Sequence, residues 1–167
     1  MPDILKRAFV ITEDRDFYSH HGVDLSAIIR AAVANVKHNA IKQGASTITQ
    51  QLAKNMFLTQ DVTWERKITE MFAAMELEKK FSKEQILEFY INNIYYANGY
   101  YGIEAAAQGY FGKSVNDLSL SQLIFLVAIP NNPSKYDPVN NLDAAKSRRD
   151  LILQQLYAEG ERSEEHT

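Results

Sequence analysis

The sequence contains no cysteine, which excludes a disulfide framework and leaves the redox compartment undetermined by composition. Its longest purely apolar run, residues 123–130, is far shorter than the ~20 residues of a membrane-spanning helix. The N-terminus lacks the layout of a signal peptide. We therefore expect any membrane anchor to be an upstream helix outside this sequence.

Positive charge is also scarce, since 18 basic residues face 21 acidic ones and the net charge is −3. Proteins that bind a nucleic-acid backbone normally present a basic surface, so this balance argues against nucleic acid as the main partner. Any anion-binding site in the chain must therefore be local.

Strand signals are missing as well: no segment alternates convincingly between apolar and polar residues, and no hairpin is predicted. Helical patterns follow one another instead. With 46% hydrophobic residues, 167 residues suffice for one domain with a real core. The predicted fold class is all-α, with a single domain over residues 1–160. The tail 161–167 resembles translated adaptor sequence, so we expect it to be unstructured and the chain to be a fragment of a longer protein.

The first predicted helix begins at Pro2 or Asp3 and places Glu13 at or beyond its end. The next runs from Leu25 to about Asn39, with Asp24 as a good N-cap. Its apolar stripe consists of Leu25, Ile28, Ile29, Ala32, Val33 and Val36. Two interpretations of this stripe stay open: packing in the core, or contact with a bilayer, which the flanking Arg30, Lys37 and Lys42 would favour.

The segment from Gln43 to Asn55 combines a helix start with an unusual polar face. Gly44 and Ala45 lead into a helix that we expect Ser46 to cap. One face repeats at helical spacing and carries Thr47, Gln50, Gln51 and Lys54. Hydroxyl and amide groups ending in one lysine, beside a helix N-terminus, suit an oxygen-rich anionic ligand. A merely polar surface is the competing interpretation.

The following helix starts after Thr63, its expected N-cap, and presents a wide apolar face that we expect to lie in the core. That face consists of Trp64, Ile68, Met71, Phe72 and Met75. Glu70 lies on a largely apolar side, so its carboxylate needs a partner, and Arg66 and Lys67 are one turn away. Both cations could equally hold a phosphate. An ordinary surface salt bridge, worth about 0.3–0.5 kcal/mol, is the alternative.

The second half of the chain continues the helical pattern. A capping box at 82–85 opens a helix with a core stripe, Gly112 stops the next helix, and a capped helix from Ser119 ends at Pro130. Residues 131–141 form a loop by composition, and the last helix covers about Leu142 to Ala158. It carries Arg148 and Arg149, for which two interpretations stay open: solvated charges on a terminal helix, or a functional role.

The densest polar cluster lies between Thr12 and Asp24, where adjacent carboxylates, aromatic residues and histidines gather. A solvated helix face needs no such mixture, and we hypothesise that Glu13 is a general base. The adjacent His20 and His21 suit a shared metal poorly, and no third ligand is apparent.

Together these residues resemble the peptidoglycan glycosyltransferase domain, glycosyltransferase family 51, of class A penicillin-binding proteins and monofunctional transglycosylases. The resemblance covers about Ala8 to Tyr157. The first family motif, E-D-x-x-F-x-x-H-x-G, corresponds to Glu13, Asp14, Phe17, His20 and Gly22. The second runs from Gly44 to Asn55, and the third, R-K-x-x-E, is Arg66, Lys67 and Glu70. Two further motifs lie at 86–92 and 148–153.

The resemblance implies a lysozyme-like fold that polymerises lipid II at the outer face of the cytoplasmic membrane. A small hydrophobic subdomain, roughly between the first two motifs, would contact that membrane. The partners implied are lipid II, the growing glycan strand, the membrane surface and other cell-wall synthesis proteins. A divalent cation, Mg²⁺ or Mn²⁺, is implied as a possible cofactor, and no organic cofactor is.

The resemblance also implies roles for single residues. Glu13 would be the base, and Glu70 would assist near the leaving group by hydrogen bonding or by helping to hold the cation. Lys54, Arg66 and Lys67 would neutralise the pyrophosphate. The remaining substrate-binding residues would be Asp14, Phe17, His20, Ser46, Thr47, Gln50, Gln51 and Asn55.

Two rival functions remain. A lysozyme or lytic transglycosylase would also use a glutamate in an all-α domain, but it needs no pyrophosphate site. A non-catalytic helical domain that binds glycan or a divisome partner would not need Glu13 and Glu70 together.

Overall fold

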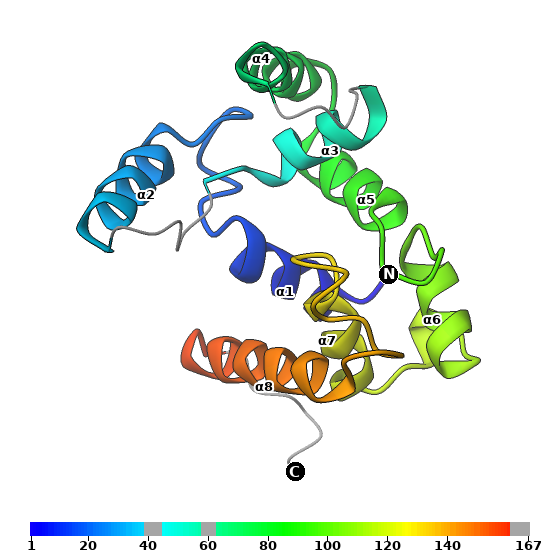
Figure 1. The fold of residues 1–167 in the computed structure, drawn as a ribbon. Helices are drawn as coiled ribbons and strands as arrows, with labels where there is room; N and C mark the ends of the chain where they lie inside the picture. The colour runs from blue at the N-terminus through cyan, green and yellow to red at the C-terminus, as the bar shows by residue number, and fades with distance from the viewer. Residues whose placement is uncertain (39–44, 58–62, 161–167) are drawn as a thin grey trace. The chain divides into compact units, whose positions relative to one another are not determined.

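A computed structural model describes residues 1–38, 45–57 and 63–160, and their regular secondary structure is entirely helical (Figure 1). The helices are α1 (Asp3–Glu13), α2 (Leu25–His38), α3 (Ile48–Phe57), α4 (Trp64–Lys80), α5 (Lys83–Asn93), α6 (Ile103–Phe111), the 3₁₀ helix η1 (Val115–Asp117), α7 (Leu120–Ala128) and α8 (Leu142–Ala158). The all-α prediction is thereby confirmed for these residues. Gly44, Lys42 and the tail 161–167 lie outside them.

The chain divides into two compact units, Met1–Arg15 with Ile91–Thr167, and Asp16–Tyr90. In the first unit, α7 is the centre of the core, because residues 123–129 are all buried. A helix that is apolar all round has no face to offer to water. Both α1 and α8 pack against α7, and Ser119 and Gln122 form the predicted capping box.

A short turn in the first unit is fixed by side-chain contacts and forms no strand. Tyr95 and Tyr101 form an isolated antiparallel bridge around Asn98 and Gly99. Asn98 has φ 49°, a conformation that asparagine tolerates better than most residues. Its amide donates to the Asp137 carboxylate at 2.7 Å and to the Tyr110 hydroxyl at 2.9 Å, which fixes the turn.

The last helix of the first unit gives its two arginines structural neighbours. The guanidinium of Arg148 lies 5.9 Å from the centre of the Tyr136 ring, and Arg149 pairs with Asp150 at 2.7 Å.

The second unit packs α3 against α4 and is completed by α2 and the first part of α5. Its core contains the predicted stripe of α5, including Ile86, Leu87 and Tyr90, all fully buried. Asp24 caps α2 as predicted, because its Oδ1 accepts from the Ala27 N–H at 2.9 Å. Thr63 likewise caps α4 and accepts from the Arg66 N–H at 3.1 Å.

The predicted cap of α3 is wrong: Thr47, not Ser46, occupies that position. The Thr47 hydroxyl accepts from the Gln50 N–H at 3.1 Å, and the Gln50 side chain accepts from the Thr47 N–H at 3.0 Å. This reciprocal pair is a capping box. The hydroxyl of Ser46 instead accepts from Lys67 at 2.9 Å.

The prediction that the apolar face of α4 lies in the core is also wrong. Trp64 is 86% exposed, Phe72 65% and Ile68 54%. The buried side is formed by Glu70, Ala74 and Leu77. Gly22 packs against it so closely that a Cβ on Gly22 would lie 2.8 Å from the backbone of Ala74. Because the atoms of α4 in this contact are backbone atoms, the residue at position 22 must be glycine.

The stripe on α2 is exposed as well. Leu25, Ile29 and Val33 are each about two-thirds exposed, so the core interpretation fails for them. The side chains of Val36 and Lys37 lie outside the described part of the chain. No helix in the described ranges is both long and apolar enough to span a membrane.

Candidate active site

The predicted base, Glu13, is the last residue of α1 in the first unit and is half-buried. The side-chain amide of Asn131 donates to its Oε1 at 3.3 Å. Asp14 follows as the C-cap, and its N–H donates to the Val10 carbonyl at 3.0 Å. A helix end therefore presents the Glu13 carboxylate beside a loop amide. Asn131 was missed because an Asn/Pro-rich segment indicates only a loop.

The second candidate centre, in the other unit, is the Glu70 cluster, which we define as Ser46, Arg66, Lys67 and Glu70. The Glu70 side chain is only 3% exposed, and its carboxylate accepts from Arg66 Nη1 at 3.0 Å and from Lys67 Nζ. Lys67 also reaches Ser46 in front of α3. The alternative of an ordinary surface salt bridge is therefore wrong, because the carboxylate is withdrawn from water and depends on its cations.

Arg66 retains donors beyond its bond to Glu70. Its side chain is 14% exposed, and its Nε is buried without a hydrogen-bond partner among the described residues. A guanidinium carries five N–H donors. The cluster thus places cationic donors near the start of a helix.

The polar face of α3 is only partly turned toward open surface. Thr47 and Gln50 are 2% and 1% exposed and use their oxygens in the capping box. Thr47 also donates to the Gly22 carbonyl at 2.6 Å, and Gln51 accepts from the Tyr90 hydroxyl at 3.0 Å. Lys54 is half-buried and Asn55 exposed in the last turns of α3. Substrate contact by these residues stays a prediction.

Phe17 and His20 belong to the interior of the second unit. Phe17 is fully buried, and the ammonium of Lys83 lies 4.5 Å from the centre of its ring. The Nδ1 of His20 accepts from the Gly22 N–H at 3.2 Å. These contacts support the loop from Asp16 to Asp24.

The described residues contain no group of three or more His, Cys, Asp or Glu side chains that could hold a metal ion. Glu70 does not fit a direct ligand, because its two oxygens already accept from Arg66 and Lys67. A carboxylate engaged by two cations offers little to a third.

A family model described as Transglycosylase matches residues 1–157. The chain belongs to the transglycosylase family. The domain is 50% identical over 160 residues to penicillin-binding protein 1A of Aquifex aeolicus and 46% identical over 160 residues to penicillin-binding protein 4 of Bacillus subtilis. Penicillin-binding protein 1A of Rickettsia typhi is 42% identical over 163 residues.

Each alignment covers 96% of this chain but only 22%, 26% and 21% of these relatives, in the same order. The transglycosylase domain therefore spans about a quarter of their length or less. The family match includes Glu13, Glu70 and all the other predicted site residues. It confirms the predicted family and the class of enzyme, one that transfers glycosyl groups, and the helices are compatible with the lysozyme-like fold expected of it.

Proposed function

We propose that the transglycosylase domain is a peptidoglycan glycosyltransferase that polymerises lipid II into β-1,4-linked glycan strands, with inversion and release of undecaprenyl pyrophosphate. The Glu70 cluster carries this proposal. Two cations fixed on a buried carboxylate near a helix N-terminus suit a departing pyrophosphate, whereas hydrolysis of a glycan releases no such anion.

Glu13 activates the acceptor in this proposal. Its carboxylate takes the proton from the 4-hydroxyl of N-acetylglucosamine as the oxygen attacks the anomeric carbon of the donor. Attack on the face opposite the leaving group inverts the α-linkage to β. The amide of Asn131 limits the rotation of the carboxylate, because it donates a hydrogen bond to Oε1 at 3.3 Å.

The leaving-group half belongs to the cations of the second unit. Arg66, Lys67 and Lys54 neutralise the charge that develops on the pyrophosphate as the bond to the sugar breaks. Glu70 acts by holding Arg66 and Lys67 in fixed positions. Ser46, Gln51 and Asn55 supply further polar contacts to the substrate.

Several motif residues act indirectly in this proposal. Thr47 and Gln50 fix the first turn of α3, and Phe17 and His20 fix the loop before α2. Asp14 terminates α1 beside the base. We assign no step to a divalent cation: Mg²⁺ or Mn²⁺ would accompany the pyrophosphate rather than occupy a carboxylate site of the described protein.

The exposed apolar residues of α2 and α4 support a location at the outer face of the cytoplasmic membrane, where lipid II is available. We define the apolar faces as Leu25, Ile29 and Val33 of α2 with Trp64, Ile68 and Phe72 of α4. Apolar side chains this exposed commonly mark a membrane or protein interface. Other cell-wall synthesis proteins remain proposed partners.

Incubation of the purified domain with labelled lipid II tests the proposal. Wild type should produce polymer, and Glu13→Gln, with an unchanged circular dichroism spectrum, should lose about 10²–10⁴-fold in rate. Shortening of preformed glycan without polymer formation would favour the hydrolytic alternative. Binding of glycan with neither reaction would favour a non-catalytic module.

A further inference from the structure

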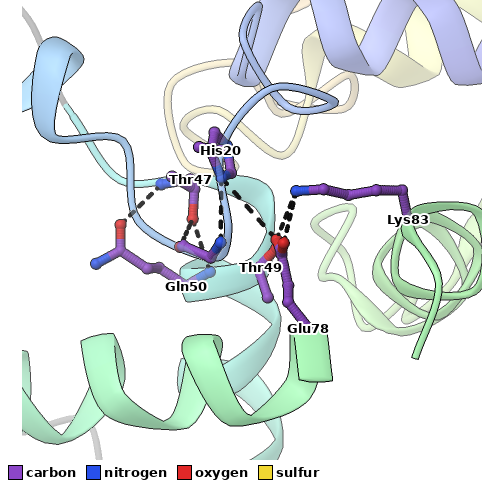
Figure 2. A network of polar contacts seen from close by, with 7 residues as sticks. His20, Thr47, Thr49, Gln50, Glu78 and Lys83 are labelled. Atoms are coloured by element: carbon purple, nitrogen blue, oxygen red, sulfur yellow. Dashed lines mark hydrogen bonds and ion pairs between the residues drawn. The ribbon is translucent and has the colours of Figure 1, made fainter. Parts of the chain in front are cut away.

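Four polar side chains meet inside the second unit, and three of them belong to none of the assigned centres (Figure 2). We call His20, Thr49, Glu78 and Lys83 the buried network. Thr49 is fully buried, and the side chains of Glu78, His20 and Lys83 are 4%, 8% and 17% exposed. They come from the loop before α2 and from α3, α4 and the start of α5.

Glu78 is the centre of the buried network. Its Oε1 accepts from the Thr49 hydroxyl at 2.6 Å, and Lys83 Nζ lies 2.7 Å from the carboxylate. His20 Nδ1 lies 4.0 Å from Oε1, too far for a hydrogen bond, and accepts from the Gly22 N–H at 3.2 Å. Burial of two charges costs several kcal/mol per ion, so the network stabilises only while all its members are paired.

A series of contacts leads from His20, which lies beside Glu78 in the buried network, to the Glu70 cluster. His20 binds the Gly22 N–H, and the Gly22 carbonyl accepts from Thr47, the cap of α3. The residue before that cap is Ser46, whose hydroxyl binds Lys67. Gly22 has φ 91° and lies directly against the backbone of Ala74, so it has little room to move.

We propose that Thr49, Glu78 and Lys83 are positioning residues for glycosyl transfer. By fixing the loop 17–22 and the first turn of α3 against α4, they set Ser46, Lys67 and Glu70 for the pyrophosphate. Displacement of a positioned group by about 1 Å can cost on the order of 10²-fold in rate. This inference rests on the proposed function.

Thr49→Val tests the positioning role, because it keeps the shape of the side chain and removes the hydroxyl that donates to Glu78. We expect kcat/KM for lipid II to fall about 10-fold or more, within the range of positional effects, while the circular dichroism spectrum is unchanged. Thr49→Ser, which retains the hydroxyl, should stay within about 2-fold of wild type on the same reasoning. The affinity for inorganic pyrophosphate, measured by calorimetry, should fall in Thr49→Val and not in Thr49→Ser.

Thr69→Val is the matched control, since Thr69 lies on the exposed side of α4 and donates to the Glu65 carbonyl of its own helix. It should leave kcat, KM and pyrophosphate affinity unchanged. The proposal would be overturned if Thr49→Val lowered the Tm but left kcat and KM normal at temperatures below that Tm. It would also be overturned if Thr49→Ser lost as much kcat/KM as Thr49→Val.

A second variant covers failure of Thr49→Val to fold. Glu78→Gln combined with Lys83→Met removes both charges together, a change that leaves no unpaired ion in the core. It should fold and show the same loss of kcat/KM. If neither variant folds, the network is needed for folding alone, and the proposal is overturned. Wild type that forms no polymer would refute the proposed function, whereas active Thr49→Val refutes only this inference.

Discussion

At the scale of single residues, the carboxylate of Glu70 is bound by two cationic side chains while it is almost withdrawn from solvent. Such a group contributes in two ways, since it pairs charges that would otherwise be buried alone and it fixes the cations around it. Substitution there should therefore alter stability and chemistry together.

Glu70→Gln should lower the free energy of unfolding by about 1–3 kcal/mol, because the guanidinium of Arg66 loses its anionic acceptor in a site that is 14% exposed. The polymerisation rate should fall in parallel. Urea denaturation gives the stability. Glu76→Gln is the control on the same helix, where Glu76 pairs with Lys79 in the open and should be dispensable. Equal stability of the two variants would contradict the expectation.

Asn131→Ala should lower kcat for polymerisation about 10-fold, a part of the 10²–10⁴-fold that a general base contributes. The amide that orients the Glu13 carboxylate is lost, whereas the fold is unaffected because Asn131 is exposed. Asn116→Ala, at an exposed position of η1 in the same unit, serves as the control. Full activity of Asn131→Ala would remove that residue from the proposed mechanism.

The sequence predicts Glu70 and its two cationic partners correctly, because spacings of three and four residues on one helix determine that contact. It does not predict the buried network. Thr49, Glu78 and Lys83 look like ordinary helix-surface residues, and only the packing of α3 against α4 makes them interior. Residues that meet across different helices carry no local spacing to detect.

At the scale of elements, helix starts and ends follow from the sequence better than helix faces do. Ser119, Thr63 and Asp24 begin their helices as predicted, since caps depend on neighbouring atoms. The apolar stripe of α4 is periodic in the way a core stripe is, yet it is exposed. Periodicity identifies an apolar face without identifying what covers it.

Ile68→Glu combined with Phe72→Glu should weaken binding to anionic phospholipid vesicles by about 10-fold or more, because each buried apolar side chain contributes roughly 1.5–3 kcal/mol. Both residues are exposed, so the fold should persist. Vesicle sedimentation measures the binding. Tyr157→Glu, at a 67% exposed position of α8, is the control. Unchanged binding of the double variant would exclude the apolar faces as a membrane contact.

Asp24 makes the stability of α2 dependent on pH. Burial alone would raise the pKa of its carboxyl, but hydrogen bonds from Ser26 and the Ala27 N–H, and the charge of Arg30, hold the pKa below its ordinary value. A depressed pKa contributes stability above the unfolded value of about 3.9, and this stability is lost as the pH falls through the folded value.

Asp24→Asn should accordingly destabilise the domain at pH 7 and match wild type more closely near pH 3 (about a unit below the unfolded pKa). Denaturant unfolding at a series of pH values measures the difference. If the difference in unfolding free energy between the two proteins grew as the pH fell, the lowered pKa of Asp24 would be contradicted.

At the scale of the whole molecule, the chain passes between its two units only twice, between Arg15 and Asp16 and between Tyr90 and Ile91. The first crossing divides the motif that begins at Glu13, so Glu13 and the loop with Phe17 and His20 belong to different units. The second lies inside α5, where Tyr90 and Ile91 are both fully buried. The sequence, read as one domain, gives no sign of either crossing, because both lie within motifs rather than in linkers.

Because the chain enters the second unit once and leaves it once, the segment Asp16–Tyr90 is a cassette, a continuous stretch that can be exchanged as one piece. A chimera that takes this cassette from the Bacillus subtilis relative, 46% identical, would exchange the apolar faces, the buried network and the Glu70 cluster in one step. Glu13 and Asn131 would remain those of the host. Any preference for lipid chain or pyrophosphate that follows the cassette is thereby encoded in residues 16–90, independently of the acceptor chemistry.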